Sequence, residues 1–301
     1  MSFVHHAIAR ALPYVPKRLV WQVSRRYIAG EHIRDAYRII QGLNQAGIKG
    51  TLDVLGEDVT TPEQVMGCRD LYLGAIRDIA SQGLQTGVSI KLSELGLRFD
   101  ESLCREVMES LVASAQTKGV FVRIDMEDSS VTQITLDIYR DLRQRYQRVG
   151  AVIQACLHRS SNDVAELLQQ GLANIRLCKG IYLEPASIAY TAAADINQSY
   201  NRLLEQLVEG DAEYVGIATH HPDLVGFAFD LIDQTNLAKS RYEFQMLLGV
   251  AESLRAELVA RGQPMRVYVP FGEHWFAYSA RRLRENPHLA GHILRNLFSR
   301  G

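Results

Sequence analysis

The chain of 301 residues has few cysteines and no long apolar run. Its four cysteines lie far apart and form no C-x-x-C pair, so we expect reduced thiols rather than disulfides or a structural metal site. No apolar stretch reaches the ~20 residues that a membrane-spanning helix needs. Arg10, Pro13 and Pro16 interrupt the apolar N-terminal segment, which argues against a secretory signal. We therefore expect a cytoplasmic protein.

An excess of charge is also missing, but the basic residues are unevenly placed. The net charge of −1 argues against a general nucleic-acid binder. Residues 1–26 nevertheless contain no acidic residue and hold Arg10, Lys17, Arg18, Arg25 and Arg26 among apolar side chains. Such a segment is typical either of peripheral contact with an anionic membrane surface or of a basic helix packed on its own domain. The sequence favours neither.

Several catalytic motifs are absent. The chain has no HExxH, GxSxG or Walker lysine loop, and no GxGxxG follows a predicted strand. His220 and His221 have no third ligand nearby in the sequence, so we expect no metal site. Zinc hydrolysis, serine hydrolysis, P-loop chemistry and a Rossmann-type dinucleotide site therefore have no support.

A short apolar run followed by a stretch of helical period repeats along the chain from residue 48. The predicted strands are Ile48–Leu55, Gly87–Leu92, Val120–Met126, Ala151–Leu157, Asn174–Lys179, Val215–Thr219, Tyr242–Leu247 and Arg266–Val269. Thr61 to Gln64 form a capping box before one helix, and Asp100 or Ser102 caps the next. Eight such units predict an α/β fold, a (β/α)8 TIM barrel. We expect a single domain, with a helical N-terminal extension over residues 1–45 and the barrel and C-terminal helix over 46–301.

Polar side chains gather at the ends of these predicted strands. Active sites of (β/α)8 barrels lie where the strands end and the next loops begin. A charged residue inside a buried strand is costly unless it is paired, so a ring of them at equivalent places favours a functional site over packing. The ring comprises Lys91, Asp125, Gln154, Arg176, Lys179, Thr219, His220, Glu243, Gln245 and Tyr268.

The segment 266–287 suits a small carboxylate ligand. Its strand should end at Pro270 and Gly272, and a helix follows. In that helix Tyr278 lies one turn before Arg281 and Arg282, and Glu285 lies one turn after them. Paired guanidinium groups can hold a carboxylate through parallel hydrogen bonds. The alternative, a solvated helix face, is the commoner arrangement of such residues, and the ring upstream favours the ligand.

Ordered motifs over nearly the whole chain resemble the proline dehydrogenase family, which also forms one domain of the bifunctional proline utilization protein. The similarity runs from about Tyr27 to the C-terminus, and its length is similar to the bacterial monofunctional form. The motifs are LNQAGIKGTLDVLGEDV (43–59), SIKLSELGL (89–97), RIDMEDS (123–129), IRLCKGIYLEP (175–185), ATHHP (218–222), YEFQMLLGV (242–250), VYVPFG (267–272) and YSARRLRENP (278–287).

The resemblance implies FAD-dependent oxidation of L-proline to Δ1-pyrroline-5-carboxylate, the first step of proline degradation to glutamate, with a membrane quinone as electron acceptor. It also implies the site. The substrate carboxylate would be bound by Arg281, Arg282 and Lys91, with Glu285 bracing the arginines and Asp125 orienting the cations. The proline ring would be flanked by Tyr278 and Leu247. Close to both substrate and flavin would lie Tyr182 and Tyr268. The flavin would be held by Gln154, Arg176, Cys178, Lys179, Gly180, Ile181, Thr219, His220 and Gln245.

Two departures from the family pattern concern the flavin end of the site. Ile181 stands where the family commonly has alanine, and Ala192–Ala194 replace side chains that are often charged. The first change is expected to crowd the flavin or the substrate, and the second either to weaken FAD binding or to leave the cofactor end of the site more open. Neither affects Lys91 or the arginine pair, so the expected activity is unchanged.

The residues also suggest a mechanism. Hydride can leave the carbon beside nitrogen only when that nitrogen has a free lone pair, so prolinium must lose a proton. Two arginines and a lysine around one carboxylate would disfavour the ammonium form. Two alternatives remain open: a Schiff-base enzyme that uses Lys91 or Lys179, and a non-catalytic barrel that docks through its basic N-terminus.

Overall fold

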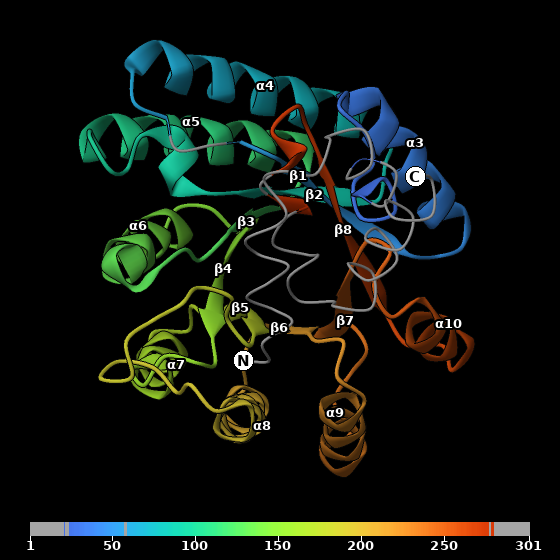
Figure 1. Ribbon diagram of the computed structural model, residues 1–301. Helices are drawn as coiled ribbons and strands as arrows, with labels where there is room; N and C mark the ends of the chain where they lie inside the picture. Colours follow the sequence, from blue (N-terminus) through green and yellow to red (C-terminus); the bar gives the residue numbers. More distant parts are fainter. Residues whose placement is uncertain (1–20, 22–23, 57–58, 277, 280–301) are drawn as a thin grey trace, which may run out of the picture.

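The computed structural model describes residues 21, 24–56, 59–276, 278 and 279, and over these it forms a closed barrel of eight parallel strands (Figure 1). The ring closes where β1 pairs in parallel with β8. The strands are β1 (Lys49–Val54), β2 (Thr86–Ile90), β3 (Val122–Ile124), β4 (Val149–Gln154), β5 (Asn174–Cys178), β6 (Tyr214–Ala218), β7 (Tyr242–Leu247) and β8 (Met265–Phe271). The predicted (β/α)8 barrel is confirmed, and each predicted strand overlaps an observed one.

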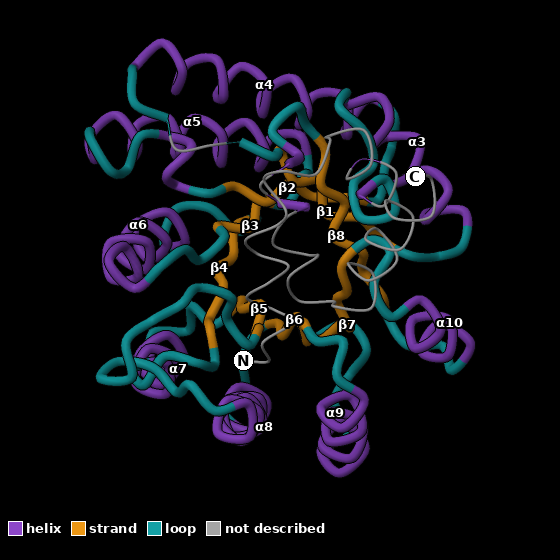
Figure 2. Tube along the Cα trace, in the orientation of Figure 1, coloured by secondary structure: helices purple, strands orange, loops and turns teal. Residues whose placement is uncertain are grey.

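Helices surround the barrel on its outer face, one after each of the first seven strands (Figure 2). They are α3 (Ile33–Gln45) before β1, and then α4 (Pro62–Ser81), α5 (Glu101–Lys118), α6 (Thr132–Arg143), α7 (Ser160–Gln169), α8 (Ala193–Glu209), α9 (Pro222–Thr235) and α10 (Glu252–Ala260). Short 3-10 turns, η2 (Leu92–Leu95) and η3 (Ser129–Val131), follow β2 and β3.

The predicted helix starts depend on side-chain caps that the structure contains. Thr61 accepts a hydrogen bond from the backbone N–H of Gln64, whose side chain bonds back to the cap, so the capping box of α4 is confirmed. Asp100, rather than Ser102, caps α5 by accepting from Leu103 N at 2.9 Å. The division of the chain into one domain with residues 1–45 as an extension stays a prediction, because residues 1–20 lie outside the described part.

Strand β8 continues past the proline that was expected to end it. The carbonyl of Pro270 accepts from Ala29 N at 2.9 Å, and Phe271 O accepts from Leu55 N at 2.7 Å. The missing N–H of Pro270 therefore faces away from β1, on the side where pairing with β7 has already ended at Tyr268. A proline that no neighbouring strand needs as a donor is tolerated, so the expected stop was placed too early.

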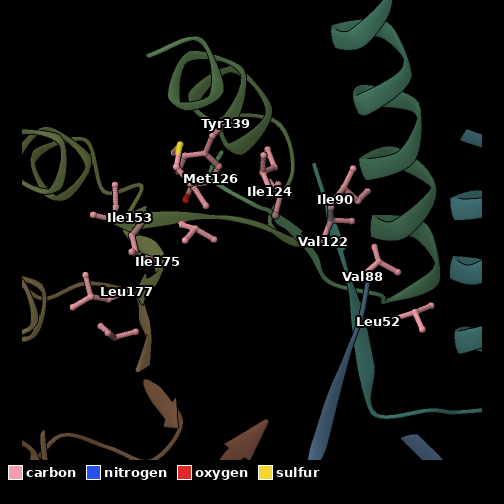
Figure 3. Packing of buried hydrophobic residues seen from close by; sticks show 14 of the residues in the cluster. Leu52, Val88, Ile90, Val122, Ile124, Met126, Tyr139, Ile153, Ile175 and Leu177 are labelled. Carbon is pink, nitrogen blue, oxygen red and sulfur yellow. The ribbon is translucent and has the colours of Figure 1, made fainter. Parts of the chain in front are cut away.

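The apolar core lies between the barrel and its helices. Leu52, Val88, Ile90, Val122 and Ile124 are almost completely buried and point outward from the strands (Figure 3). Successive side chains of a strand point to opposite faces, so the residues between them point into the barrel. This alternation assigns every second residue to the core and leaves the others to the barrel interior.

The barrel interior is polar over much of its depth. Arg123 donates to Ala151 O at 2.9 Å and to Asn174 O at 2.7 Å, and its burial lowers the guanidinium pKa to about 10. Beside it, the carboxylate of Glu243 accepts from Arg266 Nε and lies 3.5 Å from Lys49 Nζ. Glu243 therefore belongs to an internal ion pair, and not to the ring of residues at the barrel mouth where the sequence placed it.

Replacing Glu243 by Gln is expected to lower the free energy of unfolding by about 2 kcal/mol at neutral pH, because Arg266 would lose its buried counterion. Burial alone would raise the pKa of Glu243, but Arg266 outweighs burial and lowers it to about 2. The stabilisation is present above the unfolded pKa of ~4.3 and is lost as the pH falls through about 2.

Urea unfolding of wild type and variant between pH 3 and 7 measures this difference, which should shrink toward the acid end. Glu252→Gln is the matched control: Glu252 pairs with Arg26 on the surface, with side chains 46% and 55% exposed. Its loss should cost less than ~1 kcal/mol. Equal effects of the two variants would contradict the assigned role of Glu243.

Candidate active site

A cavity of about 570 Å³ lies at the C-terminal ends of the strands. It is lined by every predicted site residue that the structure describes, apart from Glu243. These are Lys91, Asp125, Gln154, Arg176, Cys178, Lys179, Gly180, Ile181, Tyr182, Thr219, His220, Gln245, Leu247, Tyr268 and Tyr278. Their shared place follows from the parallel sheet, because all eight strands end at one rim. The individual roles assigned to them stay predictions.

The C-terminal part of the predicted site lies mostly outside the described residues. Tyr278 lines the cavity and is buried, close to the end of the described chain. Arg281, Arg282 and Glu285 lie outside the described residues. The helix that was predicted to present them to the substrate therefore remains an expectation.

Asp125 is the centre of a hydrogen-bond network in the cavity. Its Oδ1 accepts from Ser89 Oγ at 2.6 Å and from Arg176 Nη1 at 2.8 Å, and its Oδ2 accepts from Tyr268 OH at 2.7 Å. Burial raises the pKa of Tyr268 well above its usual value, and the Asp125 carboxylate adds to this, so the phenol stays protonated. Asp125 thus orients a cation and a hydroxyl at once.

Arg176 is held from three sides. Besides Asp125, its Nε donates to Gln245 Oε1 at 2.6 Å, and the amide of Gln245 donates in turn to Glu243 Oε1 at 3.0 Å. The guanidinium carbon lies 5.3 Å from the ring centroid of Tyr268, within cation–π range. A cation fixed in this way is pre-organised to meet negative charge that develops in the cavity.

Lys91 has different partners from those the sequence suggested. Its Nζ lies 2.6 Å from Asp53 Oδ1 and 3.6 Å from Glu94 Oε1. Burial alone would lower the pKa of Lys91, but the carboxylates, Asp53 first, outweigh burial and raise it well above its usual value. The lysine is therefore charged, and its charge is already balanced. It adds less to the expected surplus of positive charge than the sequence predicted.

Sequence reasoning missed Asp53 and Glu94. Asp53 lies inside β1, within a run whose neighbours are apolar, and its side chain lines the cavity. An acidic residue in a buried strand was a sufficient signal, of the same kind that identified Asp125. Glu94 lies in η2 behind the cavity, where its Oε2 accepts from Tyr72 OH at 3.0 Å. Nothing in the local sequence distinguishes it from a solvated turn residue.

The loop after β5 forms one wall of the cavity. Gly180 has φ +95°, and a Cβ at this position would lie 2.3 Å from Cys156 Sγ, so only glycine fits. Burial lowers the pKa of Lys179. Ile181 is 39% exposed at the rim, and Ala192–Ala194 are exposed at the start of α8. The isoleucine therefore lines the cavity while part of its side chain stays exposed to solvent.

The described residues contain no group of three or more His, Cys, Asp or Glu side chains that could hold a metal ion. His220 instead accepts a hydrogen bond at Nε2 from Leu247 N at 2.9 Å. This bond ties the end of β6 to β7 at the cavity wall. The imidazole is therefore one of the groups that shape the cavity.

Curated relatives match nearly the whole chain. It is 35% identical to "Proline dehydrogenase" of Deinococcus radiodurans over 286 residues, which are 93% of this chain and 92% of that protein. It is 34% identical to "Proline dehydrogenase 1" of Bacillus subtilis over 278 residues, 92% and 91% of the two chains.

The fold has a solved counterpart in a longer protein, proline utilization A from Bdellovibrio bacteriovorus inactivated by N-propargylglycine. The TM-score is 0.83 at 26% identity, covering 88% of this chain and 33% of that one. The family model for proline dehydrogenase matches residues 36–293, which include all eight strands and every residue of the cavity. The chain is therefore an enzyme that belongs to the proline dehydrogenase family.

Proposed function

We propose that this enzyme oxidises L-proline to Δ1-pyrroline-5-carboxylate with FAD as hydride acceptor, and that a membrane quinone takes the electrons. Membership of the family and the relatives over about nine-tenths of the chain support proline as the substrate. The observation that carries the proposal is the cavity itself, which places Lys91 and the Asp125–Arg176 pair beside tyrosines at the barrel mouth.

The residues present fit a flavin. The volume of about 570 Å³ lies within the range of small-molecule sites and suits a ring system with a small substrate. Its lining offers amide and cationic donors in Gln154, Arg176, Lys179 and Gln245. Within the described residues, the buried Nδ1 of His221 on the cavity wall has no hydrogen-bond partner. We infer that these groups, with Cys178, Gly180, Ile181, Thr219 and His220, would hold FAD.

The substrate end of the cavity would bind a carboxylate. Lys91 offers an ammonium group fixed by Asp53, and we infer that Arg281 and Arg282, braced by Glu285, add two guanidinium groups. Leu247 and Tyr278 would flank the ring, while Tyr182 and Tyr268 would limit its movement. Holding a small ligand at both its charged end and its ring places the reacting carbon in a defined position.

The amine must lose a proton before hydride transfer. Because Lys91 is already paired with Asp53, the positive charge that disfavours prolinium would come mainly from the arginine pair. FAD supplies the hydride acceptor when it is bound. Arg176, locked between Asp125 and Gln245, would then stabilise the negative charge that the hydride brings to that end of the cavity.

The purified protein should show the visible absorbance bands of a flavin, and anaerobic L-proline should bleach them. Borohydride should trap no substrate on Lys91, because this lysine is protonated and ion-paired and so is a poor nucleophile. Trapping on Lys179, whose pKa is lowered by burial, would support the Schiff-base alternative. Two absorbance scans and a mass spectrum after borohydride measure both outcomes. A colourless protein trapped on its substrate would identify a Schiff-base enzyme instead, and a colourless inert protein would favour the non-catalytic barrel.

The electron acceptor concerns a part of the chain, residues 1–26, of which the structure describes only residues 21 and 24–26. We propose contact between the basic segment 1–26 and an anionic membrane surface, which would bring the enzyme to its quinone. Among the helices of the described part, none is both long and apolar enough to cross a bilayer. Binding of the full chain to anionic vesicles, compared with neutral ones, tests this contact.

A further inference from the structure

At the cavity wall and just behind it, two carboxylates share one ammonium group. Lys91 contacts Asp53 at 2.6 Å and Glu94 at 3.6 Å, and the side chains of the two acids are 1% and 3% exposed. One carboxylate is enough to balance one ammonium, and a second ionised carboxylate would leave the cluster with net negative charge. The second is therefore the natural place for a proton.

The surroundings distinguish the two acids. Asp53 holds Lys91 through a short hydrogen bond, whereas Oε1 of Glu94 has no hydrogen-bond partner among the described residues. Its other oxygen accepts from Tyr72 OH at 3.0 Å. Glu94 can therefore accept a proton at Oε1 and keep the hydrogen bond from Tyr72, and it gives up only the longer ion pair of 3.6 Å with Lys91.

The charged and titratable groups that face Glu94 come from four elements. They are Cys68 and Tyr72 of α4, Asp53 of β1, Lys91 after β2, and Glu127 after β3. Burial, together with the nearby carboxylates of Asp53 and Glu127, raises the pKa of Glu94 to about 7, against the opposing effects of Lys91 and of the hydrogen bond from Tyr72. Near neutral pH this carboxyl is therefore divided between its two forms.

We propose that Glu94 takes up a proton when a carboxylate binds beside Lys91, so that it acts as a positioning residue that couples substrate binding to pH. This inference rests on the proposed function, in which Lys91 faces the substrate carboxylate. An arriving anion adds negative charge beside the cluster and favours the protonated form of Glu94. With the carboxyl neutral, the ammonium of Lys91 has one counterion fewer and is freer to bind the ligand.

The proton balance differs between two ligands. Zwitterionic proline must release the ammonium proton to become reactive, and uptake by Glu94 offsets that release within the site. Tetrahydro-2-furoate, which has a ring oxygen in place of the nitrogen, carries no such proton. Its binding must therefore draw the proton for Glu94 from the buffer.

Calorimetric titration of the flavin-loaded enzyme with tetrahydro-2-furoate measures this uptake, in buffers of different ionisation enthalpy between pH 6 and 9. We expect wild type to take up a fraction of a proton near and above pH 7, approaching at most about one per site. Its Kd should then rise with pH by up to about tenfold per unit. In Glu94→Gln the uptake should vanish and Kd should become nearly flat.

Two further variants locate the proton. Tyr72→Phe removes a hydrogen bond that favours ionised Glu94, so its uptake window should move to higher pH. Glu127→Gln is the matched control: Glu127 is also buried, but it accepts from Ser93 N at 2.9 Å rather than contacting Lys91, so uptake should persist. The imidazoles of His220 and His221 remain in every variant, so any uptake due to them survives in Glu94→Gln.

Wild type that binds the anion without proton uptake, or equal uptake in Glu94→Gln, would overturn the inference while leaving the proposed function intact. If proton uptake were lost in Glu127→Gln but kept in Glu94→Gln, the proton would bind to Glu127 rather than to Glu94. This result would also overturn the inference. Failure of the anion to bind wild type at all would contradict the proposed function, and this inference with it.

Discussion

Replacing Lys91 by Met is expected to lower kcat/KM for L-proline by about 10³-fold, mostly through KM. Methionine keeps much of the side-chain volume, but in the proposed complex it would leave Asp53 and Glu94 near the substrate carboxylate without their shared counterion. Breaking a buried pair from one side costs about 3–5 kcal/mol, which corresponds to two to four powers of ten. Steady-state turnover with an artificial electron-accepting dye measures the loss, and the flavin absorbance should survive.

The double variant Lys91→Met/Asp53→Asn tests the pairing behind this effect. Neutralising Asp53 removes the acid that the Lys91→Met substitution leaves uncompensated, so the double variant should recover about tenfold in kcat/KM over the single one. Asp53→Asn alone should impair the enzyme, because it frees the lysine from its anchor. A double variant whose loss equals the product of the two single losses would show that Asp53 and Lys91 act independently.

Replacing Asp125 by Asn is expected to lower kcat/KM by about 10²–10³-fold and to reduce the flavin content of the purified protein. Three donors converge on Asp125, from Ser89, Arg176 and Tyr268. An asparagine has one acceptor oxygen, and its NH2 group must face at least one of those donors. Arg176 would then be a buried cation with only neutral partners.

The ratio of visible to ultraviolet absorbance gives the flavin content, and dye-linked turnover of the loaded fraction gives the rate. Asp141→Asn is the matched control, because Asp141 is 61% exposed on α6 and pairs with Arg105 outside the barrel. Its activity should stay within about twofold of wild type. If Asp125→Asn kept its flavin and full activity, the network around Asp125 would have no role in the site.

The barrel was predictable from this sequence because each strand can be recognised from its own residues and from those next to it. An apolar run such as that in β4 is bounded by a helix signal on either side, and Thr61 and Asp100 cap the helices that follow β1 and β2. The position of Asp125 and Arg176 toward the ends of two predicted strands also assigned both to the barrel mouth, where the structure pairs them. Local signals of this kind do not depend on partners distant in the chain.

The sequence could not predict which side chains contact each other when they are far apart in the chain. Asp53 and Lys91 are 38 residues apart, and Tyr72 and Glu94 come together only when α4 packs against η2. Whether a lysine is a free cation or a neutralised one depends on such distant partners, and that difference changed the expected charge of the site. The end of β8 shows the same limit, because Pro270 is tolerated only where β7 has already ended.

Because strand residues alternate between the two faces of the sheet, the residues that stabilise the fold and the residues that line the site are different sets. The outward side chains, such as Leu52 and Ile124, supply the buried apolar surface that holds the helices, while the inward ones carry the ion pairs and the ligand groups. Evolution can therefore exchange inward residues to suit a new substrate while the scaffold keeps its hydrophobic support. Deleting one strand residue would exchange the two sets, so descendants of this barrel should vary by substitution within strands and by length only in loops.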